Sequence, residues 1–478
     1  MKFSYNWIHE FVEGLDVPAR DLERLITMKT AECEGIEEAG ALLEGASVAR
    51  VLSVEPIVGS HNRKVIAETD RYGKKTVVCG APNVRAGMTT AYVPLGMKTI
   101  DGVASDGMLA SAAELGINRD HSGILELDSL DRLHPDHVIE VDNKSLTHRP
   151  DLWGHYGMAR EVAAIVHKPL RDPVDLALVP NGPARIKVEI EDLALCPRYS
   201  ALVFENVTVQ LSPLWLQYRL EAIGLNPINN IVDVTNYIMS ELAQPMHAFD
   251  ADRLHGDTIF ARPAKTGERI VALNDEEYEL KSANLVIADA AGPVAIAGVI
   301  GGRDSAIGNA TTRIVLESAN FQAASVRKTS VALKLRTDAS MRFEKSQDPV
   351  NTVRALARAI FLLNEVSPGI RLVGGLADVK RELPPAPVIE LSVDWLRRKL
   401  GRGIETGEVQ AILKSLGFGV TSCGTQLLSV AVPSWRATKD ISIGDDLVEE
   451  VGRMIGYDSI APQAPKIEAT VAPLDRQR

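Results

Sequence analysis

Four polar side chains lie close together in an apolar segment, residues 226–250, which reads NPINNIVDVTNYIMSELAQPMHAFD. They are Thr235, Asn236, Gln244 and His247. Buried polar groups need hydrogen-bond partners, so the segment predicts either a structural hydrogen-bond network or a binding pocket. These residues alone leave both interpretations open. No zinc site is indicated, because His247 and His255 have no cysteine pair near them.

A glycine-containing segment, AIAGVIGG at 295–302, is followed by the apolar run VLESANF at 315–321, which contains Glu317. Adjacent glycines let the backbone approach a ligand closely, although a sharp turn between strands explains them equally well. The phosphate-loop pattern GxxxxGK[ST] is absent from this segment. Glu317 needs a partner or a ligand if it faces inward, and on the opposite face of a strand it would be solvated.

The segment 325–345 is locally basic in a chain whose net charge is −11. It carries six basic side chains, Arg327, Lys328, Lys334, Arg336, Arg342 and Lys345, against Asp338 and Glu344. Such a patch is what an RNA-binding surface requires in an acidic protein. A surface loop neutralised by acidic neighbours is the alternative, and by itself the segment slightly favours that alternative.

A cluster of carboxylates occupies the segment 439–458. Asp446, Glu449 and Glu450 are spaced i, i+3 and i+4, and Asp440 precedes them. Like charges at this spacing destabilise a helix slightly, and hard oxygen ligands suit Mg²⁺. Without further information an acidic, solvated helix face is the better interpretation.

The elements around these residues predict a multidomain α+β protein. Short β-like runs separated by Gly, Asn and Pro continue from residue 46 to about 141, which predicts a small barrel or sandwich. A mixed α+β region follows from about 185 to 380, with an amphipathic helix over 351–366. The proline-rich segment 382–388 separates it from a compact unit that reads strand, helix, strand, helix, with a first helix at 405–416.

The composition excludes several classes of protein. With 478 residues, 45% hydrophobic and 24% charged, the chain is typical of globular proteins with several cores. No stretch reaches the roughly 20 apolar residues of a membrane span, and we find no signal peptide at the N-terminus. The four cysteines match no disulfide or metal pattern, so we expect reduced thiols and a cytoplasmic protein.

Several long motifs, in order along the chain, resemble the β subunit of bacterial phenylalanyl-tRNA synthetase. They are VCGAPNVRAG at 78–87, SDGMLASAAELG at 105–116, VDVTNYIMSELAQPMHAFD at 232–250 and RKTSVALKLRTDASMRFE at 327–344. The resemblance extends over essentially the whole chain. It also indicates that the chain ends before the catalytic-core-like and anticodon-binding modules of that family.

The resemblance implies a domain layout. The expected parts are an N-terminal helical unit at 1–39, an EMAP-type oligonucleotide-binding β-barrel at 40–151, a connecting helix and linker at 152–194, an editing domain at 195–381, a small αβ domain that contacts the α subunit at 389–460, and a linker at 461–478. The segment 59–73 departs from the family's usual pattern and retains only modest positive charge.

The resemblance also implies residue roles. Glu317 would accept the hydroxyl of a tyrosine attached in error, and Ala297 and Gly298 would shape the pocket floor. Thr235, Asn236 and His247 would hold the terminal adenosine and its ester and orient a water molecule. The implied Mg²⁺ ligands are Asp440, Asp446, Glu449 and Glu450, which reverses the interpretation of the acidic helix given above.

By resemblance the partners are an α subunit, in an α2β2 heterotetramer, and tRNA(Phe). ATP would be used at the α-subunit site, since this chain shows no ATP-binding signature of class II synthetases. The expected function is therefore support of tRNA(Phe) charging together with hydrolysis of mischarged Tyr-tRNA(Phe). The alternative is a non-catalytic module that binds tRNA and the α subunit and has an idle editing pocket.

Overall fold

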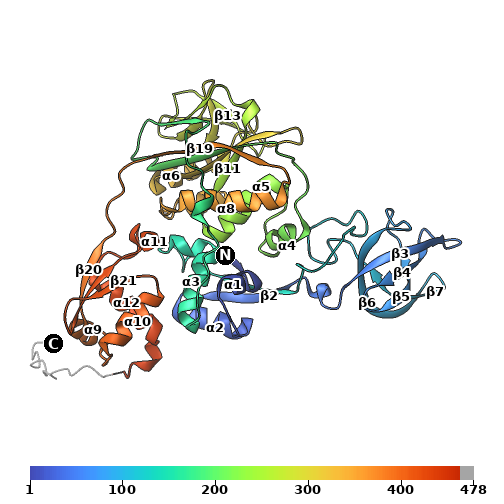
Figure 1. Cartoon of the computed structure of the whole chain (residues 1–478), viewed down its shortest axis with the longest axis horizontal. Helices are drawn as coiled ribbons and strands as arrows, with labels where there is room; N and C mark the ends of the chain where they lie inside the picture. Colours follow the sequence, from blue (N-terminus) through green and yellow to red (C-terminus); the bar gives the residue numbers. More distant parts are fainter. Residues whose placement is uncertain (463–478) are drawn as a thin grey trace, which may run out of the picture.

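A computed structural model describes residues 1–462 and shows four parts (Figure 1). The N-terminal unit and helix α3 lie in the middle, between a β-rich unit, a large central domain and a C-terminal unit. The predicted linker at 461–478 falls almost entirely outside the described residues. Within residues 1–462, no helix is both long and apolar enough to cross a membrane, and all four cysteines are free.

The N-terminal unit is a mixed structure, which corrects the prediction of a helical unit. Its elements are β1 (Lys2–Ser4), α1 (Tyr5–Phe11), α2 (Ala19–Lys29) and β2 (Cys33–Ala39), and β8 (Asp136–Val141) completes a sheet ordered β1-β8-β2. The sequence placed β8 in the barrel. A strand of three to seven residues carries too little pattern to show its partner, because strand pairing is set by the chain far away.

The β-rich unit is a five-stranded antiparallel sheet ordered β5-β4-β3-β6-β7. Its strands are β3 (Ser47–Pro56), β4 (Arg63–Thr69), β5 (Gly73–Cys79), β6 (Thr89–Ile100) and β7 (Val103–Leu109), preceded by the 3₁₀ helix η1 (Ala41–Leu43). The sheet curls so that its two edge strands approach each other. Lys75 Nζ on β5 lies 2.6 Å from Asp106 Oδ2 on β7. The β-rich texture of the sequence is thus confirmed, and its classification as an oligonucleotide-binding barrel stays a prediction.

A connecting segment ties the N-terminal unit to the central domain. It contains η2 (Pro150–Trp153), α3 (His155–Val166) and η3 (Leu176–Leu178). The His155 Nε2 atom accepts a hydrogen bond from the backbone N–H of Ser4 at 2.9 Å, and its Nδ1 lies 2.8 Å from the carbonyl oxygen of Ser240 in α5. Burial lowers the pKa of His155 to about 3, so this neutral imidazole is a fixed bridge between two parts.

The central domain contains two sheets and a layer of helices. Its strands are β9 (Lys187–Ile190), β10 (Arg198–Glu205), β11 (Met246–Asp250), β12 (Thr258–Pro263), β13 (Arg269–Val271), β14 (Glu277–Glu279), β15 (Leu285–Ala288), β16 (Pro293–Ile296), β17 (Ile300–Gly301), β18 (Arg313–Asn320) and β19 (Arg371–Lys380). Its helices are α4 (Leu214–Ala222), α5 (Asn230–Leu242), η4 (Ala251–Arg253), α6 (Ala323–Leu333), α7 (Asp338–Phe343) and α8 (Asn351–Val366).

The four-stranded sheet, ordered β11-β18-β10-β19, lies between helices and the second sheet, ordered β17-β16-β15-β12-β9. Successive side chains of a strand point to opposite faces. Leu202 and Leu316 accordingly pack in one core with α5 and α8, whereas Tyr199 and Val315 pack in another core with β15. Side chains at alternate positions from Val315, which include Glu317, therefore face the second sheet.

The C-terminal unit contains a three-stranded sheet ordered β20-β22-β21 and several helices. Its elements are β20 (Val388–Ser392), α9 (Val393–Leu400), α10 (Thr406–Ser415), β21 (Gly419–Ser422), β22 (Leu427–Ala431), α11 (Ser434–Ala437), α12 (Gly444–Ile455) and η5 (Tyr457–Ser459). The predicted helix at 405–416 is α10, which is followed by Gly417 at φ +87°. The predicted order of strand, helix, strand, helix was wrong, because α9 follows β20 directly and precedes α10.

Candidate functional site

The strand-pairing register brings Glu317 and His247 side by side on the four-stranded sheet. Glu317 of β18 lies opposite His247 of β11 and opposite Ala201 of β10. Residues directly opposite one another share a face of the sheet. Tyr199 precedes Ala201 by two positions and shares that face too, and its hydroxyl donates a hydrogen bond to Glu317 Oε2 at 2.7 Å.

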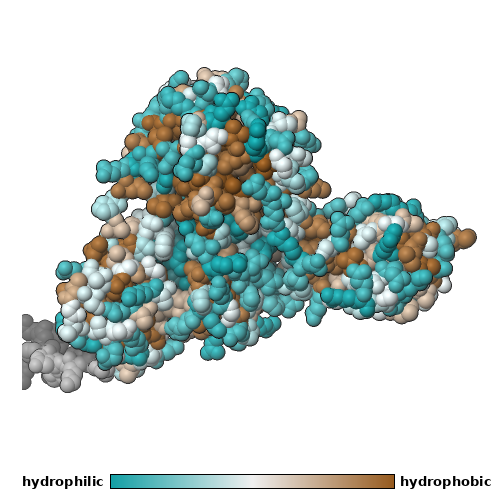
Figure 2. All heavy atoms as spheres, in the orientation of Figure 1, coloured by the Kyte–Doolittle hydropathy of each residue, from teal (hydrophilic) through white to brown (hydrophobic). Residues whose placement is uncertain are grey.

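A pocket of about 70 Å³ opens between this row and the second sheet. Glu317, His247, Ala297 and Gly298 are among its lining residues, as the family resemblance implied. The other lining residues are mostly apolar: Pro245, Met246, Ile287, Ala295, Ile296, Val299, Ile300, Gly301, Ala339 and Phe343. Figure 2 shows hydrophobic surface gathered over the part of the central domain where β11 and α6 lie.

Two glycines are required by this geometry. Gly298 adopts φ +69°, and a Cβ there would lie 2.9 Å from a methyl group of Val326 in α6. A Cβ on Gly301 would lie 2.3 Å from Cε1 and 2.7 Å from Nε2 of His247. The absence of a side chain at Gly301 therefore makes room for the imidazole ring.

Burial controls the charge of both polar groups in the pocket. It raises the pKa of Glu317 to about 7, and the hydrogen bond from Tyr199 opposes that rise. Burial lowers the pKa of His247 to about 4, so the imidazole is neutral at pH 7. Its Nε2 atom is buried and has no hydrogen-bond partner among the described residues, which leaves it available to a ligand.

The four polar residues of the segment 226–250 do not form one pocket, and this corrects the pocket hypothesis. Thr235 donates to the Val232 carbonyl oxygen within α5 at 2.7 Å, and Gln244 donates to the Ala319 carbonyl oxygen at 2.9 Å. Asn236 is half-buried on α5 and does not line the pocket. Of these residues, only His247 shares the pocket with Glu317, because α5 packs on the other face of the sheet.

Sequence reasoning missed Tyr199. The residue stood in the run YSALVFENV, which was interpreted only as a strand. The available signal was its hydroxyl, since a tyrosine buried in an apolar strand must find a hydrogen-bond partner. The sequence could not show that the partner is 118 residues away.

The basic run divides into two groups. Arg336 and Lys345 pair with Glu344, and Arg342 pairs with Asp338. Arg327, Lys328 and Lys334 are exposed and have no ion pair among residues 1–462. All three lie on α6 or at its C-cap, and Val326 of the same helix approaches Gly298 of the pocket. Unneutralised positive charge therefore lies on a helix that borders the pocket.

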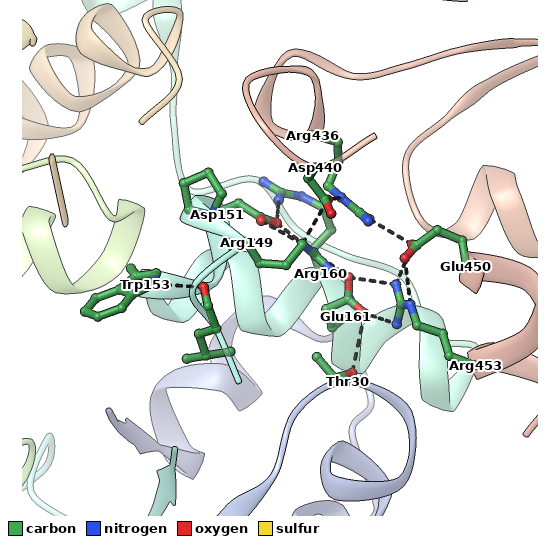
Figure 3. A network of polar contacts seen from close by, with 12 residues as sticks. Thr30, Arg149, Asp151, Trp153, Arg160, Glu161, Arg436, Asp440, Glu450 and Arg453 are labelled. Carbon is green, nitrogen blue, oxygen red and sulfur yellow. Dashed lines mark hydrogen bonds and ion pairs between the residues drawn. The ribbon is translucent and has the colours of Figure 1, made fainter. Parts of the chain in front are cut away.

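The acidic residues of the C-terminal unit belong to a buried ion-pair network (Figure 3). Glu450 accepts from Arg436 at 2.8 Å and from Arg453 at 2.6 Å, and Asp440 pairs with Arg436 and lies 3.6 Å from Arg149. The network continues to α3 and η2 through Glu161, Asp151 and Arg160. Four arginines and four carboxylates thus join the C-terminal unit to the connecting segment.

These contacts do not fit the predicted Mg²⁺ ligand set. Asp440 and Glu450 are occupied by arginines, which would repel a cation. Asp446 accepts hydrogen bonds from the backbone N–H groups of Ser442 and Ile443 at the start of α12, and Glu449 is exposed. No group of three or more His, Cys, Asp or Glu side chains within residues 1–462 is arranged to hold a metal ion.

Comparison with known proteins places both regions in described domains. Residues 195–368 match the B3/4 domain and residues 389–457 match the tRNA synthetase B5 domain. The pocket lies within the first match. Arg436, Asp440, Glu450 and Arg453 of the network lie within the second.

Curated relatives are similar in sequence over nearly the whole chain. The chain is 71% identical to the phenylalanine–tRNA ligase beta subunit of Solibacter usitatus, over 99% of this chain and 62% of that protein. It is 37% identical to the beta subunit of Salinibacter ruber, over 96% of this chain and 59% of that protein. It therefore spans about three fifths of the length of these relatives.

A solved N-terminal fragment of the Pyrococcus horikoshii phenylalanyl-tRNA synthetase beta subunit is similar at a TM-score of 0.45 and 12% identity, covering 96% of this chain and 99% of that one. That likeness is too weak to support an argument about the fold. The sequence identities and the two matched domains carry the comparison. The chain contains a B3/4 domain and a tRNA synthetase B5 domain, and it is similar in sequence to bacterial phenylalanine–tRNA ligase beta subunits.

Proposed function

We propose that this chain supports the charging of tRNA(Phe) together with an α subunit, and that its pocket hydrolyses mischarged Tyr-tRNA(Phe). ATP would be used at the α-subunit site, within an α2β2 assembly in the cytoplasm. No step of this proposal passes through Mg²⁺ on α12, because the carboxylates there do not form a ligand set. The observation that carries the editing proposal is the buried Glu317 carboxyl beside the unpartnered His247 imidazole in a small apolar pocket.

The chemistry of discrimination supports this assignment. A hydrophobic synthetic site rejects an added hydroxyl only about 100-fold, so a ligase for phenylalanine needs a second site that recognises tyrosine. A site that hydrogen-bonds a hydroxyl discriminates strongly against the analogue that lacks it. Glu317 offers such a group inside apolar walls. The pocket, at about 70 Å³, is far smaller than the roughly 300–1,000 Å³ of typical ligand sites, so it suits a small group rather than a whole nucleotide.

The proposed roles follow from position. Glu317 binds the phenol hydroxyl, while Ala297 and Gly298 form part of the wall. His247 Nε2 hydrogen-bonds the ester or the attacking water. Thr235 and Asn236 lie outside the pocket lining, so we assign them no contact with the aminoacyl group, and their predicted contact with the terminal adenosine stays a prediction.

The substitution Glu317→Ala tests the editing function. We expect it to lower the ratio of Tyr-tRNA(Phe) to Phe-tRNA(Phe) hydrolysis by about 10- to 100-fold, since a hydrogen bond to a charged group contributes about 1.5–3 kcal/mol. Deacylation of both charged tRNAs by the chain with the α subunit is the measurement. Glu268→Ala is the matched control, because Glu268 pairs with Arg262 outside the pocket. Equal loss on both substrates would contradict the assignment.

The free cations of α6 are proposed to contact the phosphates of the tRNA acceptor end. Replacing Arg327, Lys328 and Lys334 with glutamine should weaken tRNA binding and reduce the slope of log K against log salt by about 0.7 per lost contact. Filter binding at several salt concentrations gives this slope. Arg336→Gln is the control, since Arg336 is already paired with Glu344. An unchanged slope in the triple variant would exclude this surface.

A further inference from the structure

The contact between Tyr199 and Glu317 is enclosed by protein. Tyr199 is 0% exposed and Glu317 is 6% exposed. Their side chains lie on neighbouring strands of one sheet face, and the Tyr199 hydroxyl donates to Oε2 at 2.7 Å. Among residues 1–462, no other group donates a hydrogen bond to the Glu317 carboxyl. The other oxygen, Oε1, therefore has no protein partner, and Glu317 lines the pocket.

We propose that Tyr199 is a positioning residue that holds one oxygen of Glu317, so that the carboxyl presents only Oε1 to the aminoacyl side chain. This inference deepens the proposed editing function and rests on it. Tyr199 itself does not line the pocket, so it acts through Glu317. A carboxyl held at one oxygen by a rigid strand neighbour is oriented before the substrate arrives, and this lowers the entropy lost on binding.

The other titratable groups near Glu317 do not perform this task. The Cys196 thiol is buried, burial raises its pKa, and its only hydrogen bond goes to the carbonyl oxygen of Arg198 at 3.6 Å. His247 lies opposite Glu317 in the register but is neutral at pH 7 and makes no hydrogen bond to it. The walls contributed by β15, β16 and α7 are apolar. Tyr199 is therefore the group through which the protein acts on this carboxyl.

Tyr199 also determines where the proton of Glu317 resides. Burial and the neighbouring carboxyl raise the pKa of Tyr199 well above its usual value, so its hydroxyl remains a donor. Because Oε2 is then always an acceptor, a proton taken up by Glu317 binds Oε1. Above about pH 7 Oε1 accepts from the phenol hydroxyl, and below about pH 7 it donates to the phenol oxygen. In either state the bond requires a hydroxyl on the substrate, which phenylalanine lacks.

A titration of Glu317 tests the inference without any activity assay. The carboxyl stretching band in the infrared, identified as the band lost in Glu317→Gln, gives the midpoint of protonation in the full chain. The hydrogen bond from Tyr199 stabilises the ionised form, so Tyr199→Phe should move the midpoint upward by about one pH unit, a tenfold change in the protonation equilibrium. Tyr237→Phe is the control, because the buried Tyr237 hydroxyl accepts a hydrogen bond from Arg219 and lies outside the pocket. An unchanged midpoint in Tyr199→Phe would overturn the inference.

A second measurement guards against a folding defect. Replacing Tyr199 with 3-fluorotyrosine keeps the ring and makes the hydroxyl a stronger donor, so the midpoint should move downward, opposite to the effect of Tyr199→Phe. A shift in the same direction for both changes would contradict a hydrogen-bond origin. This measurement also applies if Tyr199→Phe fails to fold.

Kinetics then separate this inference from the proposed function. With Tyr-tRNA(Phe) as substrate, Tyr199→Phe should raise KM about tenfold, change kcat less, and shift the pH profile in the direction of the infrared midpoint. If the unaltered chain with its α subunit does not hydrolyse Tyr-tRNA(Phe), the proposed function fails while the infrared result still decides the positioning role. If hydrolysis is normal and Tyr199→Phe changes neither KM nor the pH profile, the inference fails alone.

Discussion

Replacing Gly301 with alanine is expected to lower the rate of Tyr-tRNA(Phe) hydrolysis by about 100-fold. The new Cβ would lie 2.3 Å from Cε1 of His247, more than 1 Å closer than ordinary van der Waals contact, so the imidazole must move. A displacement of about 1 Å in a reacting site can cost about 100-fold in rate. Single-turnover deacylation, with saturating enzyme, measures this effect on the chemical step.

The control for this prediction is Gly292→Ala in the same domain. A Cβ at Gly292 meets no atom within 4 Å, so hydrolysis should be unchanged. Gly301→Ala should also leave the overall fold intact, since the clash falls on a side chain and not on the backbone of the sheet. A rate for Gly301→Ala within twofold of the unaltered chain would show that His247 does not take part in hydrolysis.

Replacing Glu161 with glutamine is expected to destabilise the junction between α3 and α12 by about 3 kcal/mol. Glu161 accepts from Arg453 at 2.6 Å and from Arg149 at 2.7 Å, and all three side chains are buried. Removing one member of a buried ion pair leaves an uncompensated charge, which costs about 3–5 kcal/mol. Hydrogen exchange of the α12 amides should become about 100-fold faster. Glu13→Gln, at an exposed position, is the control.

The same network gives the stability of the junction a pH dependence. Burial raises the pKa of both carboxyls, but the neighbouring arginines outweigh it: they lower the pKa of Glu450 to about 2 and hold that of Glu161 well below its usual value. A carboxyl with a depressed pKa in the folded state stabilises the fold above its unfolded pKa of about 4.5 and loses that contribution as the pH falls through the folded value. Protection of α12 should therefore decline between about pH 4.5 and 2. Glu161→Gln should show a smaller decline.

Local pattern in the sequence was sufficient for many of the elements. The amphipathic repeat at 351–366 matches α8 (Asn351–Val366), and the helix expected at 405–416 is α10. The two helices were predictable because helical periodicity is encoded within a few turns of chain. Glu317, His247, Ala297 and Gly298 were expected in a pocket from the family resemblance, and all four line it.

The errors arise where the partner lies far away in the sequence. Arg453 and Glu161 are 292 residues apart, so the carboxylates of α12 looked unpaired and were interpreted as a solvated face, and the family resemblance then implied that they are metal ligands. The third strand of the N-terminal sheet, β8, was assigned to the wrong unit for the same reason. Thr235 was predicted to lie in the pocket because it is close to His247 along the chain. The sequence does not show which face of the sheet its helix covers.

The buried network of four arginines and four carboxylates has a consequence for how the chain tolerates change. Contributions to stability of residues that share partners are not additive, so the loss of one charge is costly whereas the loss of an opposite pair can be nearly neutral. Related chains should therefore exchange these eight residues together or keep them all. The junction would be inherited as a single unit, although its members come from two regions of the sequence that are nearly 300 residues apart.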